Sequence, residues 1–512
     1  TAASRPVALG MPANANPPSH RGLITVSVML STIMQALDTT IANVALPHMQ
    51  GTMGATQDQI SWVLTSYIVA AAIVMPLTGF VTARFGRKRV FVIGVVGFTI
   101  ASMLCGAAQS LAQIVLFRLL QGVFGATLVP LSQAMLLDTY PIEKHASAMA
   151  LWGVGVMVGP ILGPSLGGYL TEYYDWRWVF YINFPVGLLA WLGLALFAQE
   201  TPTIRRHFDA LGYGLLALGI GALQMMLDRG ELLAWFASPE IVAEAVLAVA
   251  CLYLFAVQMA TAQRPFFQGR MFRDRNFVVG QLFIFVFGGL LYATLALLPP
   301  FLHNLLGYPI VDVGLILAPR GIGTMAAMML VGRLTGRIDI RYFIFLGLAL
   351  TTVALWEMSR FTQDIAVGDV IRTGLVQGVG LGFSFVPLST ISFSTLPAQF
   401  RNEGSGIYSL MRNLGGSIGI SVVTSRLSEN IQANHAGFAD YIHPFNLGVR
   451  LAGEQGPLSL TEPGGLALLE AQVTNQAALL SYLQDFRLLM GISLLSFPFV
   501  FLLRSPRHLG GR

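Results

Sequence analysis

The chain has 512 residues, of which 54% are hydrophobic and only 11% are charged. An ordinary soluble domain carries about 25% charged residues, so this chain lacks the charged surface of a water-soluble protein and is expected to lie in a lipid bilayer. The net charge of +5 gives no case for nucleic-acid binding, and two cysteines without a CxxC pair indicate neither a zinc site nor a disulfide framework.

The first 21 residues are polar and rich in proline, and we expect residues 1–21 to form a tail. The apolar run that follows is too long for the apolar part of a signal peptide, so it is expected to be the first transmembrane helix. A helical span needs about 20 mostly apolar residues and satisfies its own backbone hydrogen bonds in lipid. Fourteen such runs lie at 22–45, 59–82, 89–108, 112–137, 146–170, 177–198, 209–228, 240–260, 277–304, 311–333, 342–358, 367–396, 403–427 and 484–503.

Lysine and arginine are concentrated in alternate loops between these runs. One set of loops carries Arg84, Arg87, Lys88, Arg89, Lys144, Arg205, Arg206, Arg264, Arg270, Arg273, Arg275, Arg333, Arg337, Arg341 and Arg401. Cytoplasmic loops carry such an excess, so both tails, 1–21 and 504–512, are expected in the cytoplasm. The long polar segment 428–483 is then expected to be an external loop.

Short sequence patterns in the first half of the chain recur in the second half. The letters "QGV" and "VPLS" between residues 121 and 132 recur between residues 377 and 389, and Gly79 with Arg84 recurs as Gly332 with Arg337 at nearly the same offset. We therefore expect two parallel six-helix halves, 22–198 and 277–503, with two extra helices at 209–260 between them. Parallel halves related by an axis along the membrane normal are the architecture of major facilitator transporters.

The chain resembles the fourteen-helix drug:proton antiporters of the major facilitator superfamily, most closely the EmrB branch. The resemblance covers essentially the whole chain. It rests on "LDTTIANVALP" (37–47), "GFVTARFGRK" (79–88), "FRLLQGVFGA" (117–126) and "GVGVMVGPILGPSLGG" (153–168), with "DWRWVFYINFPVG" and "MLDRGELLAWF" as further matches.

This resemblance implies an all-α polytopic membrane protein of the major facilitator fold, which is a transporter and not an enzyme. It implies proton-driven efflux of amphipathic or lipophilic compounds across the bacterial inner membrane by alternating access. It also implies a tripartite pump, with a periplasmic adaptor of the EmrA type and an outer-membrane channel of the TolC type as partners. The external loop 428–483 is a candidate docking segment for them, and the alternative is a plain linker.

The loop between the second and third spans carries the motif residues Gly79, Arg84, Gly86 and Arg87. In the family this motif contacts neighbouring helices and helps to stabilise the outward-open state. The family's usual Asp before the first Arg is replaced by Ala83, so the usual carboxylate partner is missing. Two roles therefore stay open for the loop, conformational gating and a positive anchor for anionic lipid headgroups.

The fifth span is expected to present a glycine ridge. Small residues every four positions share one face of a helix and let two helices touch backbone to backbone, while proline bends the helix. The resemblance implies an export direction for this motif, and the alternative is tight packing without directional meaning. The residues are Gly155, Gly159, Gly163 and Gly167, with Pro160 and Pro164 beside them.

Asp38 and Arg118 are the charged residues expected to couple transport to protons. A charge near the centre of a span costs about 2.5–3.5 kcal/mol on insertion scales, so such residues face a cavity or a partner. In a major facilitator half the first and fourth helices both line the central cavity, which would bring Asp38 near Arg118. The pair would stabilise the charged carboxylate, and separation would favour protonation. The alternative is a structural cross-link that does not titrate.

Gln121, Tyr292 and Gln377 are candidates for the substrate pocket, with plain helix packing as the alternative. The histidines suggest no metal site, and we expect no cofactor; the partners expected besides substrate are protons and membrane lipid. An exporter of one specific metabolite or lipid-like compound is the nearest alternative function. A polytopic membrane enzyme would need a cluster of polar catalytic groups and a transporter-like sensor would need an output domain, and the sequence offers neither.

Overall fold

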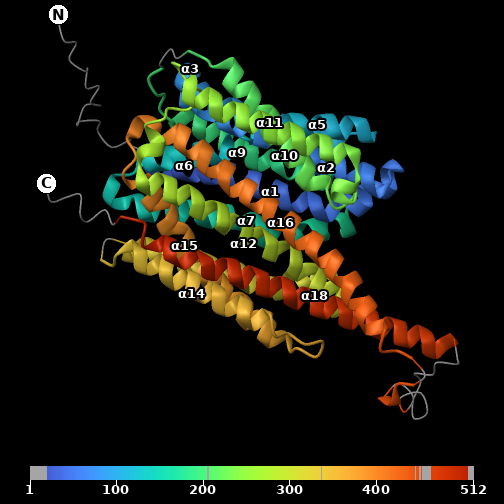
Figure 1. Ribbon diagram of the computed structural model, residues 1–512. Helices are drawn as coiled ribbons and strands as arrows, with labels where there is room; N and C mark the ends of the chain where they lie inside the picture. Colours follow the sequence, from blue (N-terminus) through green and yellow to red (C-terminus); the bar gives the residue numbers. More distant parts are fainter. Residues whose placement is uncertain are drawn as a thin grey trace, which may run out of the picture.

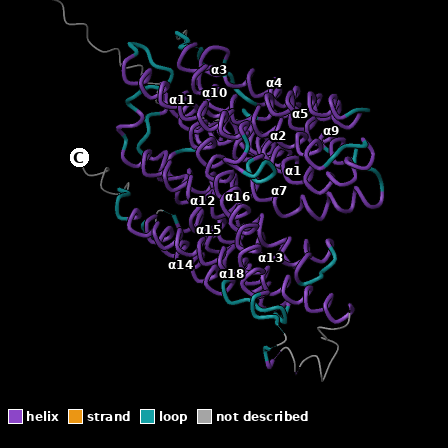
Figure 2. Tube along the Cα trace, turned by 45° about the vertical axis from the view of Figure 1, so that its right-hand side comes forward, coloured by secondary structure: helices purple, strands orange, loops and turns teal. Residues whose placement is uncertain are grey.

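The computed structural model describes residues 20–203, 207–335, 337–443, 445–448, 451 and 463–504. This part of the chain folds almost entirely into long α-helices, and its only β-type pairing is the isolated bridge between Thr335 and Ile338 (Figures 1 and 2). Thirteen of the described helical segments are long and apolar enough to cross a membrane. The predicted all-α polytopic fold is therefore confirmed.

The fourteenth predicted span, 403–427, lies in helix α16 (Arg401–Ala439). This helix is long enough to cross a bilayer, but it does not count among the thirteen apolar ones because glycine, serine, arginine and asparagine are frequent along it. It packs along α12 (Arg275–Pro300) and α18 (Pro463–Val500), and the polar side chains buried by this packing lie in its first half, such as Glu403, Ser409 and Arg412.

The first half of the chain forms six helical segments, several of them in two pieces. A 3-10 turn at Pro76 separates α2 from α3, and α5 ends five residues before Pro130, which cannot donate a backbone hydrogen bond. The helices are α1 (Arg21–Met53), α2 (Gln57–Val74), α3 (Thr78–Phe85), α4 (Arg87–Ala107), α5 (Leu111–Gly125), α6 (Leu128–Thr139), α7 (His145–Tyr173), α8 (Trp178–Tyr181) and α9 (Asn183–Phe197).

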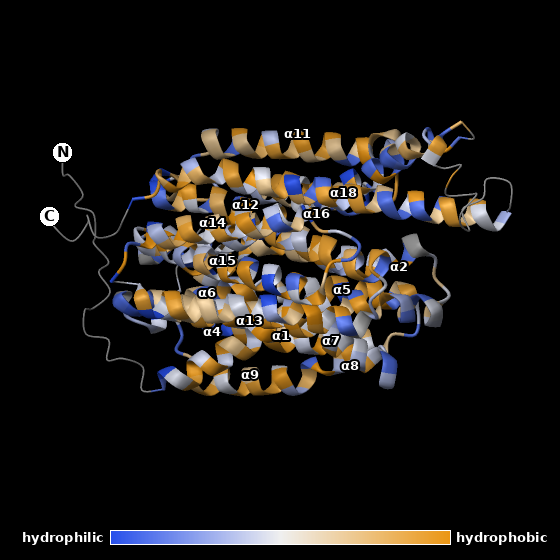
Figure 3. Ribbon diagram, turned by 90° about the horizontal axis from the view of Figure 1, so that it is seen from below, coloured by the Kyte–Doolittle hydropathy of each residue, from blue (hydrophilic) through white to orange (hydrophobic). Residues whose placement is uncertain are grey.

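Two further helices, α10 (Ala210–Arg229) and α11 (Pro239–Thr261), follow as a hairpin. α10 packs against α2 and α16, and α11 packs mainly on α10 at the edge of the bundle (Figure 3). The second half then consists of α12 (Arg275–Pro300) with the π-helical turn η5 (Phe301–Leu305), α13 (Ile310–Leu334), α14 (Ile340–Met358), α15 (Val367–Ser394), α16 and α18.

Several helices have a polar side chain that caps their N-terminal end, next to an apolar run of the sequence. Thr56 and Gln59 form a capping box at α2, and Ser110, Asp209 and Asp274 each accept a backbone N–H at the start of α5, α10 and α12. These caps satisfy backbone donors that have no partner within their own helix. The caps therefore define the residue at which each of these helices begins.

The two halves meet along α7 and α13, and again where α16 contacts α3 and α6. Ser147 donates to the carbonyl oxygen of Gly332 at 2.9 Å across the α7–α13 contact. At the same end of the bundle, Asn276 donates to the carbonyl oxygen of Arg504 at 3.0 Å and accepts from its amide at 2.8 Å. The beginning of α12 and the end of α18 therefore lie together.

The segment 428–483, expected as a loop, is helical over much of its length. α16 continues twelve residues past the predicted span to Ala439, and α18 begins at Pro463 rather than near residue 484. The two helices extend together beyond the rest of the bundle (Figure 1). The apolar stretch ends before the helix does because backbone hydrogen bonding does not depend on side-chain polarity. The side of the membrane on which this hairpin lies stays a prediction.

Candidate functional site

Asp38 lies in the middle of α1 with no exposed surface, and its carboxylate accepts three hydrogen bonds. Arg118 Nη1 donates to Oδ2 at 2.7 Å, while Gln121 Nε2 and Asn183 Nδ2 donate to Oδ1 at 2.8 and 2.9 Å. Hydrogen bonds to a charged acceptor are roughly twice as strong as neutral ones. The predicted proximity of Asp38 and Arg118 is thus found as a direct ion pair.

The Arg118 guanidinium is itself surrounded by acceptors and aromatic rings. Its Nε donates to the carbonyl oxygen of Val63 at 3.1 Å, and Nη1 also donates to Gln121 Oε1 at 2.8 Å. Its Cζ lies 4.4 Å from the centre of the Tyr67 ring and 5.6 Å from that of Phe180. A buried ion pair is tolerated only when further hydrogen bonds satisfy the remaining donors and acceptors, which is the arrangement here.

Asn183 is a member of this network that sequence reasoning missed. It is the first residue of α9, directly after the short helix α8, and its Nδ2 also donates to Ser102 Oγ at 3.0 Å. The only signal in the sequence was an amide side chain within the apolar part of "DWRWVFYINFPVG" (175–187). Through this residue the Asp38 carboxylate joins α1 to α9 as well as to α5.

The candidate pocket residues are distributed between this network and the other half. Gln121 lies at Asp38, and both ends of its amide are occupied there. Gln377 on α15 donates to Thr294 Oγ1 on α12 at 3.2 Å, and Tyr292 on α12 packs against Gly416. A role in a substrate pocket stays a prediction for all three residues.

The glycine ridge of α7 faces α1, the helix that carries Asp38. A Cβ atom at Gly159 would collide with the carbonyl oxygen of Ala36, and one at Gly163 would collide with Thr40 Oγ1. Thr40 Oγ1 donates to the carbonyl oxygen of Gly159 at 2.9 Å. The backbones of α7 and α1 are therefore in direct contact, as the spacing predicts. Whether the ridge sets the direction of transport stays a prediction.

The motif loop between α3 and α4 contains residues in three different settings. Gly79 packs against α16, where a Cβ atom would lie 2.7 Å from the Glu403 Cα. Gly86 has a positive φ of 89° and leaves room for Glu200, whose carboxylate accepts the amides of Lys88 and Arg89 at 3.0 and 3.2 Å. Arg84 is exposed beside the ring of Phe85, in keeping with an anchor at the membrane surface.

Arg87 is the buried arginine of this loop and pairs with a carboxylate from another helix. Its Nη2 lies 2.6 Å from Asp138 Oδ2 at the end of α6, and Arg401 Nη1 at the start of α16 donates to Asp138 Oδ1 at 2.7 Å. Asp138 therefore joins the loop to the second half of the molecule. From the sequence alone, the loop lacked its usual carboxylate because that position is Ala83. The carboxylate that pairs with Arg87 is Asp138, 51 residues further along the chain.

Asp138→Asn should weaken closure at this end of the bundle, which the positive loops predict to be cytoplasmic. The pairs are partly exposed, so their loss should cost only about 1 kcal/mol, which shifts an open–closed equilibrium roughly fivefold. Spin labels on Glu143→Cys and Gln399→Cys should report a larger long-distance population in Asp138→Asn by electron–electron double resonance. Asp175→Asn is the control because Asp175 pairs with Arg177 of its own loop. An unchanged distribution in Asp138→Asn would remove the closure role.

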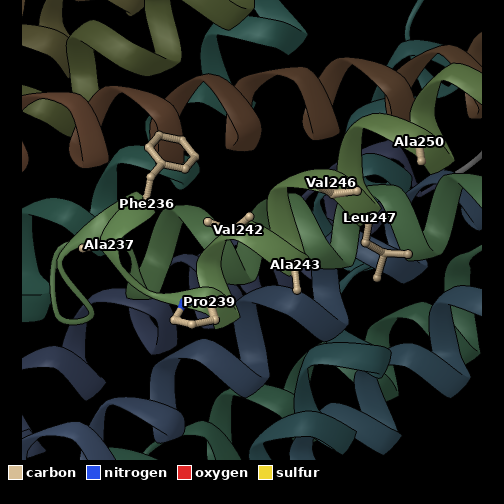
Figure 4. Close-up of a pocket in the computed structure, with 8 residues that line it drawn as sticks. All are labelled: Phe236, Ala237, Pro239, Val242, Ala243, Val246, Leu247 and Ala250. Atoms are coloured by element: carbon tan, nitrogen blue, oxygen red, sulfur yellow. The ribbon is translucent and has the colours of Figure 1, made fainter.

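A hollow of about 670 Å³ lies away from this network, on α11 and the turn before it (Figure 4). Its lining comes entirely from residues between Phe236 and Ala250 and contains no charged side chain. Substrate sites usually carry a few polar groups that fix orientation. We therefore assign this face to contact with lipid. Among the residues that the structure describes, no cluster of three His, Cys, Asp or Glu side chains forms a candidate metal site.

Comparison with known proteins gives consistent results over nearly the whole chain. A family model described as Major Facilitator Superfamily matches residues 28–420. The chain is 36% identical over 493 residues to the multidrug export protein EmrB of Escherichia coli K12, covering 96% of both. It is 37% identical over 492 residues to the fatty acid resistance protein FarB of Neisseria gonorrhoeae, covering 95% of this chain and 97% of that protein.

Solved structures share the fold at low sequence identity. The human organic anion transporter MFSD10 superposes with a TM-score of 0.58 at 14% identity, covering 93% of this chain and 100% of that one. The proton:xylose symporter XylE superposes with a TM-score of 0.60 at 13% identity, covering 96% of this chain and 97% of that one. At such identities the likeness concerns the arrangement of helices alone.

Proposed function

Because this chain belongs to the Major Facilitator Superfamily, we propose that it exports amphipathic or lipophilic compounds in exchange for protons, with Asp38 as the coupling acid. The chain is a multi-pass membrane protein of a transporter family. The observation that carries the proposal is the buried Asp38 carboxylate, which joins α1, α5 and α9 through Arg118, Gln121 and Asn183.

Protonation of Asp38 weakens its contacts with Arg118, Gln121 and Asn183. The neutral acid no longer attracts Arg118 as an ion, and its hydrogen bonds with Gln121 and Asn183 lose the strength that a charged acceptor gives them. α1 is then freer to move relative to α5 and α9. Return of the charge restores the contacts, so binding of a proton and movement of α1 are linked. Substrate binding in the central region shifts the same equilibrium.

The relatives suggest two substrate classes. The names of EmrB and FarB speak of multidrug export and of fatty acid resistance, and the chain is about equally similar to both. We place amphipathic drugs first because multidrug proteins also account for further relatives, such as EmrY at 35% identity. Export of a fatty acid or another lipid-like compound is the second candidate.

The transporter would work in the inner membrane, with both chain ends in the cytoplasm as the positive loops indicate. A periplasmic adaptor and an outer-membrane channel would complete a tripartite pump. The helical hairpin formed by the outer parts of α16 and α18 extends beyond the bundle (Figure 1), at the end of α16 opposite its first residue, Arg401, and is our candidate surface for the adaptor.

Substrate-driven proton movement in liposomes tests the proposal. Purified full-length chain is reconstituted with a pH indicator inside the vesicles, and amphipathic cations, weak organic acids and long-chain fatty acids are added in turn. At least one class should move protons opposite to its own flux, while protein-free vesicles should show no such linkage. Substrate uptake without proton movement for every compound would contradict antiport.

A further inference from the structure

A second fully buried carboxyl group lies far from Asp38 in the sequence, on α18. Asp485 has no exposed surface, and within the described residues only Asp38 and Asp485 among the acids are buried to this degree. The two differ in their surroundings. Asp38 accepts three hydrogen bonds, whereas neither carboxyl oxygen of Asp485 has a hydrogen-bond partner in the described part of the chain.

Asp485 belongs to the stripe of α18 that faces α16. One turn before it, Ser481 Oγ accepts a hydrogen bond from Asn434 Nδ2 at 2.9 Å. The two helices run antiparallel, so one turn along each from this contact brings Asn430 opposite Asp485. The Asn430 Nδ2 atom is also buried without a partner. The register thus places these two positions on facing turns of α16 and α18, and neither side chain has a hydrogen-bond partner among the described residues for these atoms.

The groups around Asp485 offer little compensation for a negative charge. Arg426 on the facing helix α16 is exposed, and in the described part of the chain it donates no hydrogen bond to either Asp485 oxygen. Its own helix contributes Tyr482 and Phe486, and the rings of Phe301 in η5 and Phe361 after α14 pack against these two. Phe301, Phe361 and Phe486 carry no titratable group, whereas Tyr482 carries a phenol hydroxyl.

An ionised carboxylate is costly in such surroundings, because it has lost its water and gained no donor. A neutral carboxylic acid is not subject to this cost. We propose that Asp485 is a second proton-binding site, which carries a proton while α18 is packed on α16 and releases it when that contact opens to water or to Arg426. This step builds on the proposed proton antiport, but the state of Asp485 can be tested separately.

Infrared difference spectroscopy of the full-length chain in lipid, without substrate, gives the direct test. Raising the pH should remove a protonated-carboxyl C=O band from the wild type. The band should be absent in Asp485→Asn and retained in Asp38→Asn. Glu429→Gln is the matched control, because Glu429 is an exposed acid on the facing helix, and it should also retain the band. An unchanged band in Asp485→Asn would overturn the proposal.

Replacement by an apolar residue gives a second, independent measurement. If Asp485 is neutral, Asp485→Leu should keep the midpoint of thermal unfolding close to that of the wild type, because the surroundings are apolar. A charged Asp485 that interacts with Arg426 would instead make Asp485→Leu clearly less stable, which would contradict the proposal even if Asp485→Asn does not fold.

Substrate-induced proton release then relates this site to transport. If Asp38 and Asp485 each release a proton, the number of protons released per bound substrate should fall by about half in Asp485→Asn, and also in Asp38→Asn. Full release in Asp485→Asn would overturn its part in the cycle. No release from the wild type would contradict the antiport function instead, and the infrared band would still decide whether Asp485 binds a proton.

Discussion

Asp38→Asn should reduce export driven by a pH gradient at least tenfold, because the variant has no titrating group at the centre of the network. The oxygen of the new amide would still accept from Gln121 and Asn183, but its NH₂ group would face the Arg118 donor that Asp38 Oδ2 now accepts. Loss of one partner from a buried ion pair costs about 3–5 kcal/mol at most. The remaining acceptors of Arg118, Val63 and Gln121, should lessen that cost.

Two measurements separate lost coupling from lost folding. Uptake into proteoliposomes under an imposed pH gradient should fail in Asp38→Asn, while exchange of labelled for unlabelled substrate without a gradient should persist. Asp38→Glu restores a titrating carboxyl group and should recover part of the gradient-driven uptake. Gradient-driven uptake at the wild-type rate in Asp38→Asn would assign the coupling proton to another group.

The ion pair at the centre of the site was predictable because charges inside apolar spans are rare. Asp38 and Arg118 lie within apolar runs of one half, and the resemblance placed both runs beside the same cavity. Asn183 was not predictable in this way, since an uncharged amide in a span carries little signal. Its role depends on the break between α8 and α9, which turns its side chain toward Ser102 and Asp38.

Contacts between the halves were harder to predict than contacts within one half. Asp138 and Arg401 are 263 residues apart, and their contact depends on how α6 and α16 dock. Periodic patterns in the sequence do not predict how these two helices pack against each other. The ends of α16 and α18 were misjudged for another reason, because the apolar pattern marks the part of a helix in lipid and not the helix itself. The close packing of the glycine ridge was predictable, because residues four apart share one helix face and a face of glycines allows a neighbouring helix to lie close.

Gly159→Ala should impair export severely, although it adds a single methyl group. The new Cβ atom would collide with the backbone carbonyl oxygen of Ala36, which cannot rotate away as a side chain would. Overpacking of this kind typically costs about 1–3 kcal/mol through backbone shifts. Ala36 lies two residues before Asp38 on α1, so a displaced backbone there also moves the carboxylate relative to Arg118 and Asn183.

Gly168→Ala is the matched control, since it lies on the same helix and no atom lies within 4 Å of an added Cβ there. We expect gradient-driven export of Gly159→Ala to fall at least tenfold and that of Gly168→Ala to stay near the wild type, with both compared at equal amounts of folded protein. A thermal unfolding midpoint lowered only in Gly159→Ala would agree with the backbone collision. Normal export by Gly159→Ala would mean that α1 and α7 can separate at this point without cost, and that the ridge does not position Asp38.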